Sequence, residues 1–323
     1  MLIKGRPLNR NPIVYVTGLS RVGSTLLDLV LGCHTQIIGL GEVYEIIRPD
    51  WDRLNSDFIC TCGKHREDCI LWGTVSKELK KMPDGSEESR YRLVLDAFYD
   101  IFGDQAILID SSKLLTGLKV LQSVSGAQNV IIIAMNRDVR AWTISRLDHR
   151  SRYSDSYKIN GFYVQNLQKN YGPQVTPLKW MIPFLSQRAS YYFLLWYYQN
   201  KQYNKFLEQQ ESDIFRLGYE EFALSPEVVL PLLCRFLGVD LEEKMFTPLH
   251  SNSHILSGNP MKSDKSRNRR IQYDHRWFKR NEWLFSAFLF KKIMSYNSAT
   301  VYSNTSNSVF ENIDNLPDSS RFT

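Results

Sequence analysis

The stretch VYVTGLSRVGSTLLDLVL, residues Val14 to Leu31, decides how the chain begins to fold. Its apolar start predicts a buried strand from Ile13 to Val16, and its apolar end predicts a helix from Leu26 to Leu31. The loop between them consists of Gly18, Leu19, Ser20, Arg21, Val22 and Gly23, followed by the hydroxyl pair Ser24 and Thr25. Glycines let a backbone approach an anion, and a helix start attracts negative charge. The stretch therefore predicts a phosphate cradle, with an ordinary Gly/Ser turn as the alternative.

The spacing of this loop matches the nucleotide-binding pattern G-x-x-x-x-G-K-[ST] only in part. Gly18 and Gly23 are correctly spaced, but Ser24 stands where that pattern has a lysine. The fixed positive charge comes earlier, at Arg21. We expect an anion here, with different nucleotide chemistry.

Composition favours one large α/β domain. The chain has 323 residues, of which 43% are hydrophobic and 23% charged, and its net charge of +6 suits an anionic ligand without demanding nucleic acid. We expect a domain over residues 1–296 with insertions at 60–104 and 146–188, the second a lid or acceptor-binding segment. The Ser/Asn-rich residues 297–323 predict a disordered tail.

Three features predict a cytoplasmic location. There is no apolar run long enough for a membrane span and no apolar core of a signal peptide at the N-terminus. Five cysteines, an odd number in a large chain, indicate a reducing compartment.

Further apolar runs predict four more strands, at Gln36–Leu40, Ala106–Asp110, Asn129–Met135 and Asp213–Leu217. Ligands of open α/β sheets gather at the carboxyl ends of strands. Glu42 and Lys113 follow two of these ends. The alternatives are a helix-start glutamate for Glu42 and a solvated lysine for Lys113. Asp110 resembles the metal-holding acid of a nucleotide hydrolase.

Arg137 follows the strongest strand, and Ser145 comes eight residues later. Eight helical residues advance about 12 Å, so we expect the two side chains to reach one multi-oxygen anion from either side. The alternative is a surface arginine and an ordinary helix serine.

Helical patterns cover Leu114–Gln122, Ala189–Leu207 and Glu227–Leu237, the last opened by Pro226. Residues 76–104 predict a charged helical surface. Five of the nine residues Lys262 to Arg270 are basic, which indicates a solvated loop, an anion clamp or a nucleic-acid patch.

A cysteine-rich loop, CTCGKHREDCILW, spans residues 60–72. One interpretation is a small zinc site formed by Cys60, Cys62, Cys69 and His65. The C-x-C spacing is not a common structural-zinc pattern, so a reduced, tightly turned loop is the favoured interpretation.

These segments together resemble the sulfotransferase superfamily over most of residues 12–283. The motifs that carry the resemblance are TGLSRVGSTLL, RDVRAWTIS, LGYEEFALSPEVVLPLLCRFLGV, SGNPMKSDKSRNRRI and the cysteine loop. The pattern is most similar to the branch with protein-tyrosine sulfotransferases and many bacterial enzymes, where a G-E pair like Gly41–Glu42 follows the first helix. Val43 replaces the second Glu of the tyrosine-sulfating enzymes, so a tyrosine acceptor does not follow. The N-terminal membrane anchor of Golgi members is also not expected.

The resemblance implies a three-layer P-loop-like α/β sandwich around a parallel sheet of about five strands. It implies transfer of a sulfuryl group from 3′-phosphoadenosine 5′-phosphosulfate (PAPS), without a metal, to a small-molecule, carbohydrate or peptide acceptor. Glu42 would be the general base, with Arg21 and Lys113 stabilising charge. The donor would be bound by Gly18, Ser20, Arg21, Val22, Gly23, Ser24, Thr25, Arg137, Ser145, Tyr219, Lys262 and Arg267. The oligomeric state and the acceptor's identity stay open.

Two other functions remain compatible with the residues. A P-loop kinase would use Asp110 to hold magnesium, although the loop lysine is missing. A non-enzymatic nucleic-acid binder would use the basic run at 262–270, but it leaves Glu42 without a role.

Overall fold

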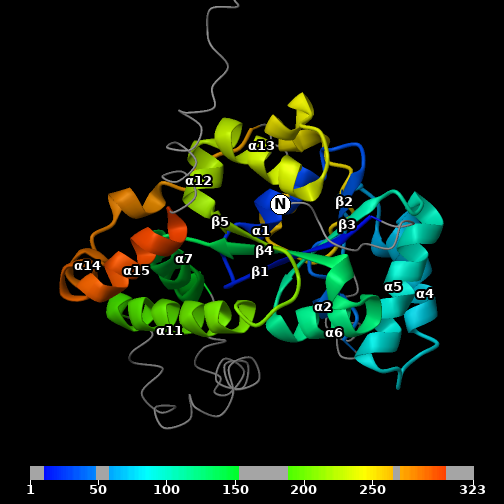
Figure 1. The fold of residues 1–323 in the computed structure, drawn as a ribbon, viewed down its shortest axis with the longest axis horizontal. Helices are drawn as coiled ribbons and strands as arrows, with labels where there is room; N and C mark the ends of the chain where they lie inside the picture. Colours follow the sequence, from blue (N-terminus) through cyan, green and yellow to red (C-terminus); the bar gives the residue numbers. More distant parts are fainter. Residues whose placement is uncertain (1–10, 49–57, 153–187, 265–269, 303–323) are drawn as a thin grey trace, which may run out of the picture.

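The computed structural model describes residues 11–48, 58–152, 188–264 and 270–302. Its centre is a five-stranded, all-parallel sheet with the strand order β2-β3-β1-β4-β5 (Figure 1). The strands are β1 (Ile13–Gly18), β2 (Ile37–Gly39), β3 (Ile107–Lys113), β4 (Val130–Asn136) and β5 (Ile214–Gly218). The predicted parallel sheet is therefore confirmed.

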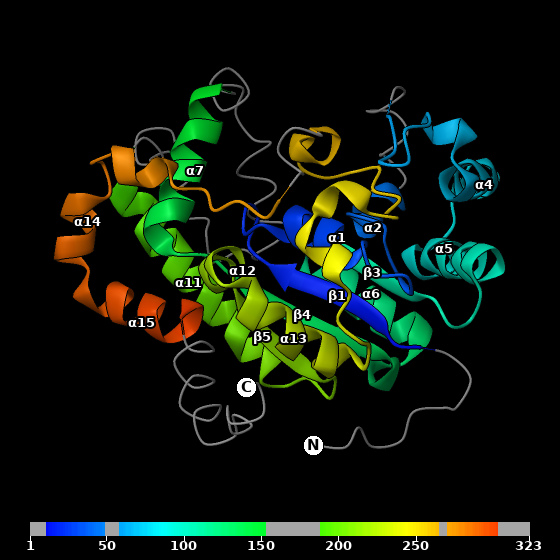
Figure 2. The ribbon, with the colours of Figure 1, turned by 90° about the horizontal axis from the view of Figure 1, so that it is seen from above.

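Helices flank both faces of the sheet. They are α1 (Ser24–Leu31), α2 (Val43–Ile46), α4 (Ile70–Leu79), α5 (Glu87–Phe102), α6 (Leu115–Ser125), α7 (Val139–Arg152), α11 (Ala189–Leu207), α12 (Tyr219–Leu224), α13 (Pro226–Leu237), α14 (Leu284–Leu289) and α15 (Lys291–Val301). Short 3₁₀ turns cover Arg66–Asp68, Ala127–Asn129, Glu243–Phe246, Pro248–His250, Pro260–Ser263 and Arg276–Lys279. In Figures 1 and 2, α1, α12 and α13 lie on one face of the sheet and α2 and α6 on the other.

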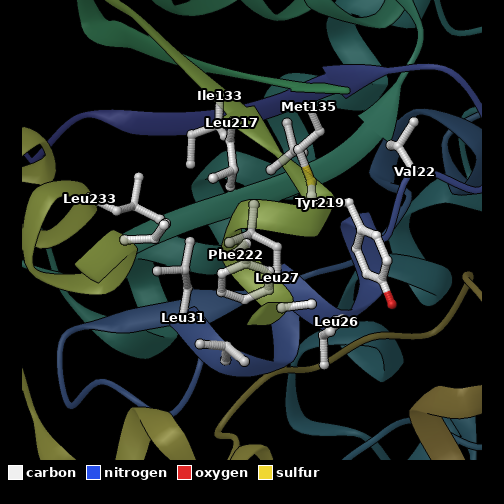
Figure 3. Close-up of a cluster of buried hydrophobic side chains, with 14 of the residues drawn as sticks. Val22, Leu26, Leu27, Leu31, Ile133, Met135, Leu217, Tyr219, Phe222 and Leu233 are labelled. Atoms are coloured by element: carbon white, nitrogen blue, oxygen red, sulfur yellow. The ribbon is translucent and has the colours of Figure 1, made fainter. Parts of the chain in front are cut away.

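Two apolar cores form because β1 is buried on both faces. Val14 and Val16 belong to the core under α1, α12 and α13, whereas Ile13 and Tyr15 belong to the core shared with α2, α4, α5 and α6. Successive side chains of a strand point to opposite faces, so a wholly apolar strand serves both layers. Figure 3 shows the first core, where Leu27 of α1 meets Phe222 of α12.

Three predictions about the elements were wrong. β3 extends to Lys113, three residues past the predicted end at Asp110, because it pairs with β1 as far as Thr17. The helices within 76–104 are not a mere surface, since Val94 and Phe98 are fully buried.

The predicted disordered tail also begins too early. The segment Asn297–Val301 is the end of α15, and both of these residues are buried. The Asn297 side chain accepts from the backbone N–H of Val139 (2.8 Å) and donates to Asp138 Oδ2 (3.0 Å), which satisfies the start of α7. Residues 303–323 and 153–187 lie outside the described residues.

Candidate active site

The carboxyl ends of the parallel strands bring the predicted site residues to one edge of the sheet. Gly18 ends β1 and Lys113 ends β3, while Arg137 and Tyr219 directly follow β4 and β5. Glu42 comes three residues after the end of β2. This convergence follows from the parallel topology, because every strand then ends on the same side.

Two glycines fix the shape of the loop from 18 to 23. Gly18 has φ +145°, and a Cβ there would lie 2.4 Å from the carbonyl oxygen of Met135. Gly23 caps α1 with φ +97°, and a Cβ there would lie 2.5 Å from the ring of Tyr219. Figure 3 shows Tyr219 beside the loop residue Val22. The glycine spacing seen in the sequence is thus required by the neighbouring strand β4 and by Tyr219 of α12, and not only by local turning.

The start of α1 offers hydrogen-bond donors to an anion. Ser24 and Thr25 occupy its first turn, where backbone N–H groups have no intrahelical acceptor. The Gly23 carbonyl already accepts from Leu26 (3.0 Å) and Leu27 (3.2 Å), so the helix is formed from its first residue. The positive end of the helix and these N–H groups suit an oxyanion, as the predicted cradle requires.

Arg21 places a positive charge in this loop, in a strained backbone conformation and close to two other arginines. Its φ of +72° is left-handed, and burial together with the nearby Arg146 and Arg137 lowers its pKa to about 10. Its Nε donates to Ser145 Oγ (2.6 Å), and within the described part of the chain it forms no ion pair with a carboxylate. A bound anion would relieve the repulsion among these arginines.

Arg137 packs against the same loop residue. Its Nη1 donates to the Arg21 carbonyl (2.9 Å), its Nη2 pairs with Asp274 Oδ2 (2.8 Å), and its guanidinium lies 4.7 Å from the ring centre of Tyr219. The buried Nε of Arg137 has no partner among the described residues. Arg137 and Ser145, which the sequence places about two helical turns apart, therefore both contact Arg21.

Glu42 and Lys113 form an ion pair, with 2.5 Å between Oε1 and Nζ. Lys113 has φ +71°; it and Arg21 are the two non-glycine residues with positive φ among those described. Its Nζ also donates to the Ser111 carbonyl (3.0 Å). Glu42 occupies the N-cap position of α2, but its side chain makes no capping hydrogen bond and pairs with Lys113 instead. The left-handed backbone of Lys113 costs roughly 1–3 kcal/mol, and strain of this kind is typical of functional sites.

Asp28 is a buried carboxyl group that the sequence prediction missed. It lies on α1, and its Oδ2 accepts from the Gly41 N–H (3.0 Å) and the Ser111 hydroxyl (2.9 Å). Burial raises its pKa to about 7. It joins the first helix to the segments that carry Glu42 and Lys113. The available signal was one acid inside the apolar run LLDLVL.

Asp110 does not have the position that a magnesium-binding acid would need. It lies within β3 as the register partner of Tyr15, not at the strand end. It is fully buried, and its carboxylate accepts hydrogen bonds from Tyr91 and from Ser112. Burial raises its pKa to about 6. The basis for the kinase interpretation is therefore removed.

The remaining donor-binding candidates differ in what they contact. Tyr219 packs on Gly23, and its hydroxyl accepts from the Asp274 N–H (3.0 Å). Lys262 donates to the carbonyls of Ile59, Ile255 and Leu256 at 3.2, 3.3 and 2.6 Å. Their contacts with a nucleotide stay predictions, and for Lys262 such a contact would replace these hydrogen bonds. Arg267 lies outside the described residues.

The cysteine loop gathers a different histidine from the predicted one. The metal-binding atoms of Cys60, Cys62, Cys69 and His254 all lie within 4.8 Å of one another. His65 is exposed and is not part of this group. The predicted ligand set was therefore wrong in its fourth member, because His254 lies far along the sequence.

None of the helices formed by the described residues has both the length and the apolar character needed to cross a bilayer. No protein-family model and no curated protein matches the chain.

Several solved structures are similar to this chain. One is the sulfotransferase domain from the curacin biosynthetic pathway, with 17% identity over 86% of this chain and 98% of that one and a TM-score of 0.46. A sulfotransferase from Alicyclobacillus acidocaldarius has 17% identity over 83% of this chain and 99% of that one, with a TM-score of 0.38. A sulfotransferase from Mycobacterium tuberculosis H37Rv has 12% identity over 79% of this chain and 76% of that one, with a TM-score of 0.43.

Proposed function

We propose that this chain transfers the sulfuryl group of PAPS to a hydroxyl or amine acceptor. The observation that carries the proposal is an anion cradle with a carboxylate–lysine pair beside it. Lys113 is the register partner of Thr17, which directly precedes Gly18, so the Glu42–Lys113 pair adjoins the first residue of the cradle. An anion site supplies the donor and a carboxylate supplies the base, the two parts that direct group transfer needs.

The donor would be bound by charge and by backbone dipoles. In the proposal, the 5′-phosphosulfate accepts hydrogen bonds from the loop and from the first turn of α1, and the 3′-phosphate is bound by Arg137 and Ser145. The support is that both residues already contact Arg21, whose charge no described carboxylate neutralises. Arginine side chains can neutralise phosphate and sulfate oxygens without a metal.

The transfer step would be in line. Glu42 takes the proton of the acceptor, whose oxygen or nitrogen forms a bond to sulfur. The bond between sulfur and the bridging oxygen breaks, and its electron pair stays on the nucleotide as 3′-phosphoadenosine 5′-phosphate. Lys113 and the loop N–H groups stabilise the charge that develops on that oxygen.

A thermal-shift titration tests this proposal against a kinase. We expect 3′-phosphoadenosine 5′-phosphate to raise the melting temperature equally with magnesium and with EDTA, because no metal takes part in the proposed binding. A ligand that binds only the folded state stabilises it by about 2.7 kcal/mol when the ligand concentration is 100 times Kd. ATP should give a smaller shift. A shift with ATP that requires magnesium, without one for the bisphosphate, would overturn the proposal.

A further inference from the structure

The three cysteines of the loop 60–69 and His254 form a compact set of soft ligands outside the proposed active site. Cys69 Sγ lies 3.7 Å from Cys60 Sγ and 3.2 Å from His254 Nδ1, and Cys60 Sγ lies 3.8 Å from the same nitrogen. In a zinc tetrahedron with Zn–S near 2.3 Å and Zn–N near 2.0 Å, the edges measure about 3.5–3.8 Å. These three separations match such edges to within a few tenths of an ångström, and Cys62 Sγ lies within 4.8 Å of the other three ligand atoms.

We propose that Cys60, Cys62, Cys69 and His254 bind one structural zinc ion as three thiolates and one imidazole. Three sulfurs and one nitrogen complete a closed tetrahedral set, which is typical of structural zinc. On binding, each thiol releases its proton to solvent, and the neutral imidazole bonds through Nδ1.

The surroundings of the four ligands favour a metal over free thiols. Cys69 caps the start of α4, where the helix dipole stabilises a thiolate. Three thiolates and Zn²⁺ carry a net charge of −1, and a cation lies nearby, since Lys262 Nζ donates to the carbonyl of Ile59, the residue before Cys60 (3.2 Å).

The backbone of His254 is held on both sides by hydrogen bonds, and its ring packs near one aromatic side chain. Its backbone N–H donates to the Gly39 carbonyl (2.7 Å), the Trp72 indole N–H donates to its carbonyl, and its ring lies 5.4 Å from that of Phe102. Supporting contacts of this kind are what hold a metal ligand in its geometry.

The metal would connect two segments far apart in sequence. Beyond His254, the Ser257 carbonyl accepts from the Glu42 N–H (3.3 Å), and the Asn259 N–H donates to Thr25 Oγ1 (3.3 Å). The ion would therefore hold the segment that borders the cradle against the cysteine loop, whatever reaction the site performs.

Elemental analysis of the full chain, purified under reducing conditions, tests the site. We expect stoichiometric zinc in the parent protein and an at least 100-fold weaker affinity in His254→Ala and Cys62→Ser, since even supporting residues around a metal change affinity by about 10–100-fold. Cys62 is exposed, so its serine variant should fold even if the histidine variant does not. His65→Ala and Cys234→Ser are the matched controls and should keep the metal.

Cobalt(II) reconstitution provides a second readout. The parent should show thiolate-to-metal charge transfer and the strong visible bands of tetrahedral cobalt, and Cys62→Ser should weaken the charge-transfer band. Reduced, metal-free protein that takes up neither zinc nor cobalt would overturn the proposal, as would loss of metal in His65→Ala with full retention in His254→Ala. A Cys60–Cys69 disulfide in freshly purified protein that binds no metal after reduction would also overturn it.

Discussion

Glu42 is ion-paired with the same lysine that would assist the leaving oxygen. The side chains of Lys113 and Glu42 are 11% and 24% exposed, so solvent reaches the carboxylate more readily than the ammonium. Lys113 contacts Oε1 of Glu42, and in the proposed reaction the second carboxylate oxygen would face the acceptor. We expect Lys113 to transfer its hydrogen bond to the bridging oxygen when the donor binds, which frees Glu42 for the proton.

Glu42→Gln separates catalysis from binding. The amide keeps the size and the hydrogen bond but cannot take a proton, so turnover of PAPS with a hydroxyl acceptor should fall by about 10²–10⁴-fold. Nucleotide affinity, measured by titration, should stay nearly unchanged. Glu45→Gln is the matched control, because Glu45 pairs with Arg48 (3.2 Å) and should leave turnover intact. Equal turnover in both variants and the parent would exclude Glu42 as the base.

At the scale of elements, α1 connects the loop after β1 to the Glu42–Lys113 pair. Its N-terminal residues form the cradle, and one turn later Asp28 bonds to the segments before Glu42 and Lys113. A rigid helix in contact with both the loop and the Glu42–Lys113 pair keeps their spacing fixed, as transfer between two bound groups requires.

The raised pKa of Asp28, about 7, makes its ionisation a cost to folding. A carboxyl whose folded pKa exceeds its unfolded pKa of about 3.9 binds more protons when the chain is folded. Its contribution to stability is therefore greatest below about pH 3.9 and is lost as the pH rises from there toward 7. Asp28→Asn removes this loss. We expect the variant to gain on the order of 4 kcal/mol relative to the parent between pH 4 and pH 8 in urea unfolding, because the folded and unfolded pKa values differ by about three units and each unit corresponds to about 1.36 kcal/mol. A pH-independent difference would contradict the assignment.

Gly23→Ala tests the shape of the cradle. The variant combines a left-handed backbone with a Cβ that would lie 2.5 Å from the Tyr219 ring. Gly103→Ala is the control, because Gly103 has φ +82° with nothing within 4 Å of its Cβ position. The backbone alone costs about 1–2 kcal/mol, so urea unfolding should show a larger loss for Gly23→Ala, together with weaker nucleotide binding. Equal losses and unchanged binding would show that the loop tolerates a side chain.

At the scale of the whole molecule, the sequence was sufficient for the sheet and for the loop after β1. Long apolar runs such as Val130–Met135 predict strands whatever surrounds them, and a parallel sheet then brings their ends together. This is why Glu42, Lys113 and Arg137 could be proposed together before the structure was known.

What the sequence could not predict depends on distant contacts. His254 lies 185 residues from Cys69, and Asn297 lies 158 residues from the Val139 N–H that it accepts from. Local composition describes both residues as polar loop or tail. Only the folded chain shows that one completes a ligand set and the other satisfies the start of a helix.

Isothermal calorimetry with 3′-phosphoadenosine 5′-phosphate and 5′-AMP tests the central claim most directly. Charged hydrogen bonds contribute about 1.5–3 kcal/mol each, so the bisphosphate should bind tenfold or more tightly than AMP. Arg137→Ala should lose most of this preference, whereas Arg92→Ala, which removes an exposed arginine on α5, should keep it. Equal affinity of the parent protein for the two nucleotides would contradict the account.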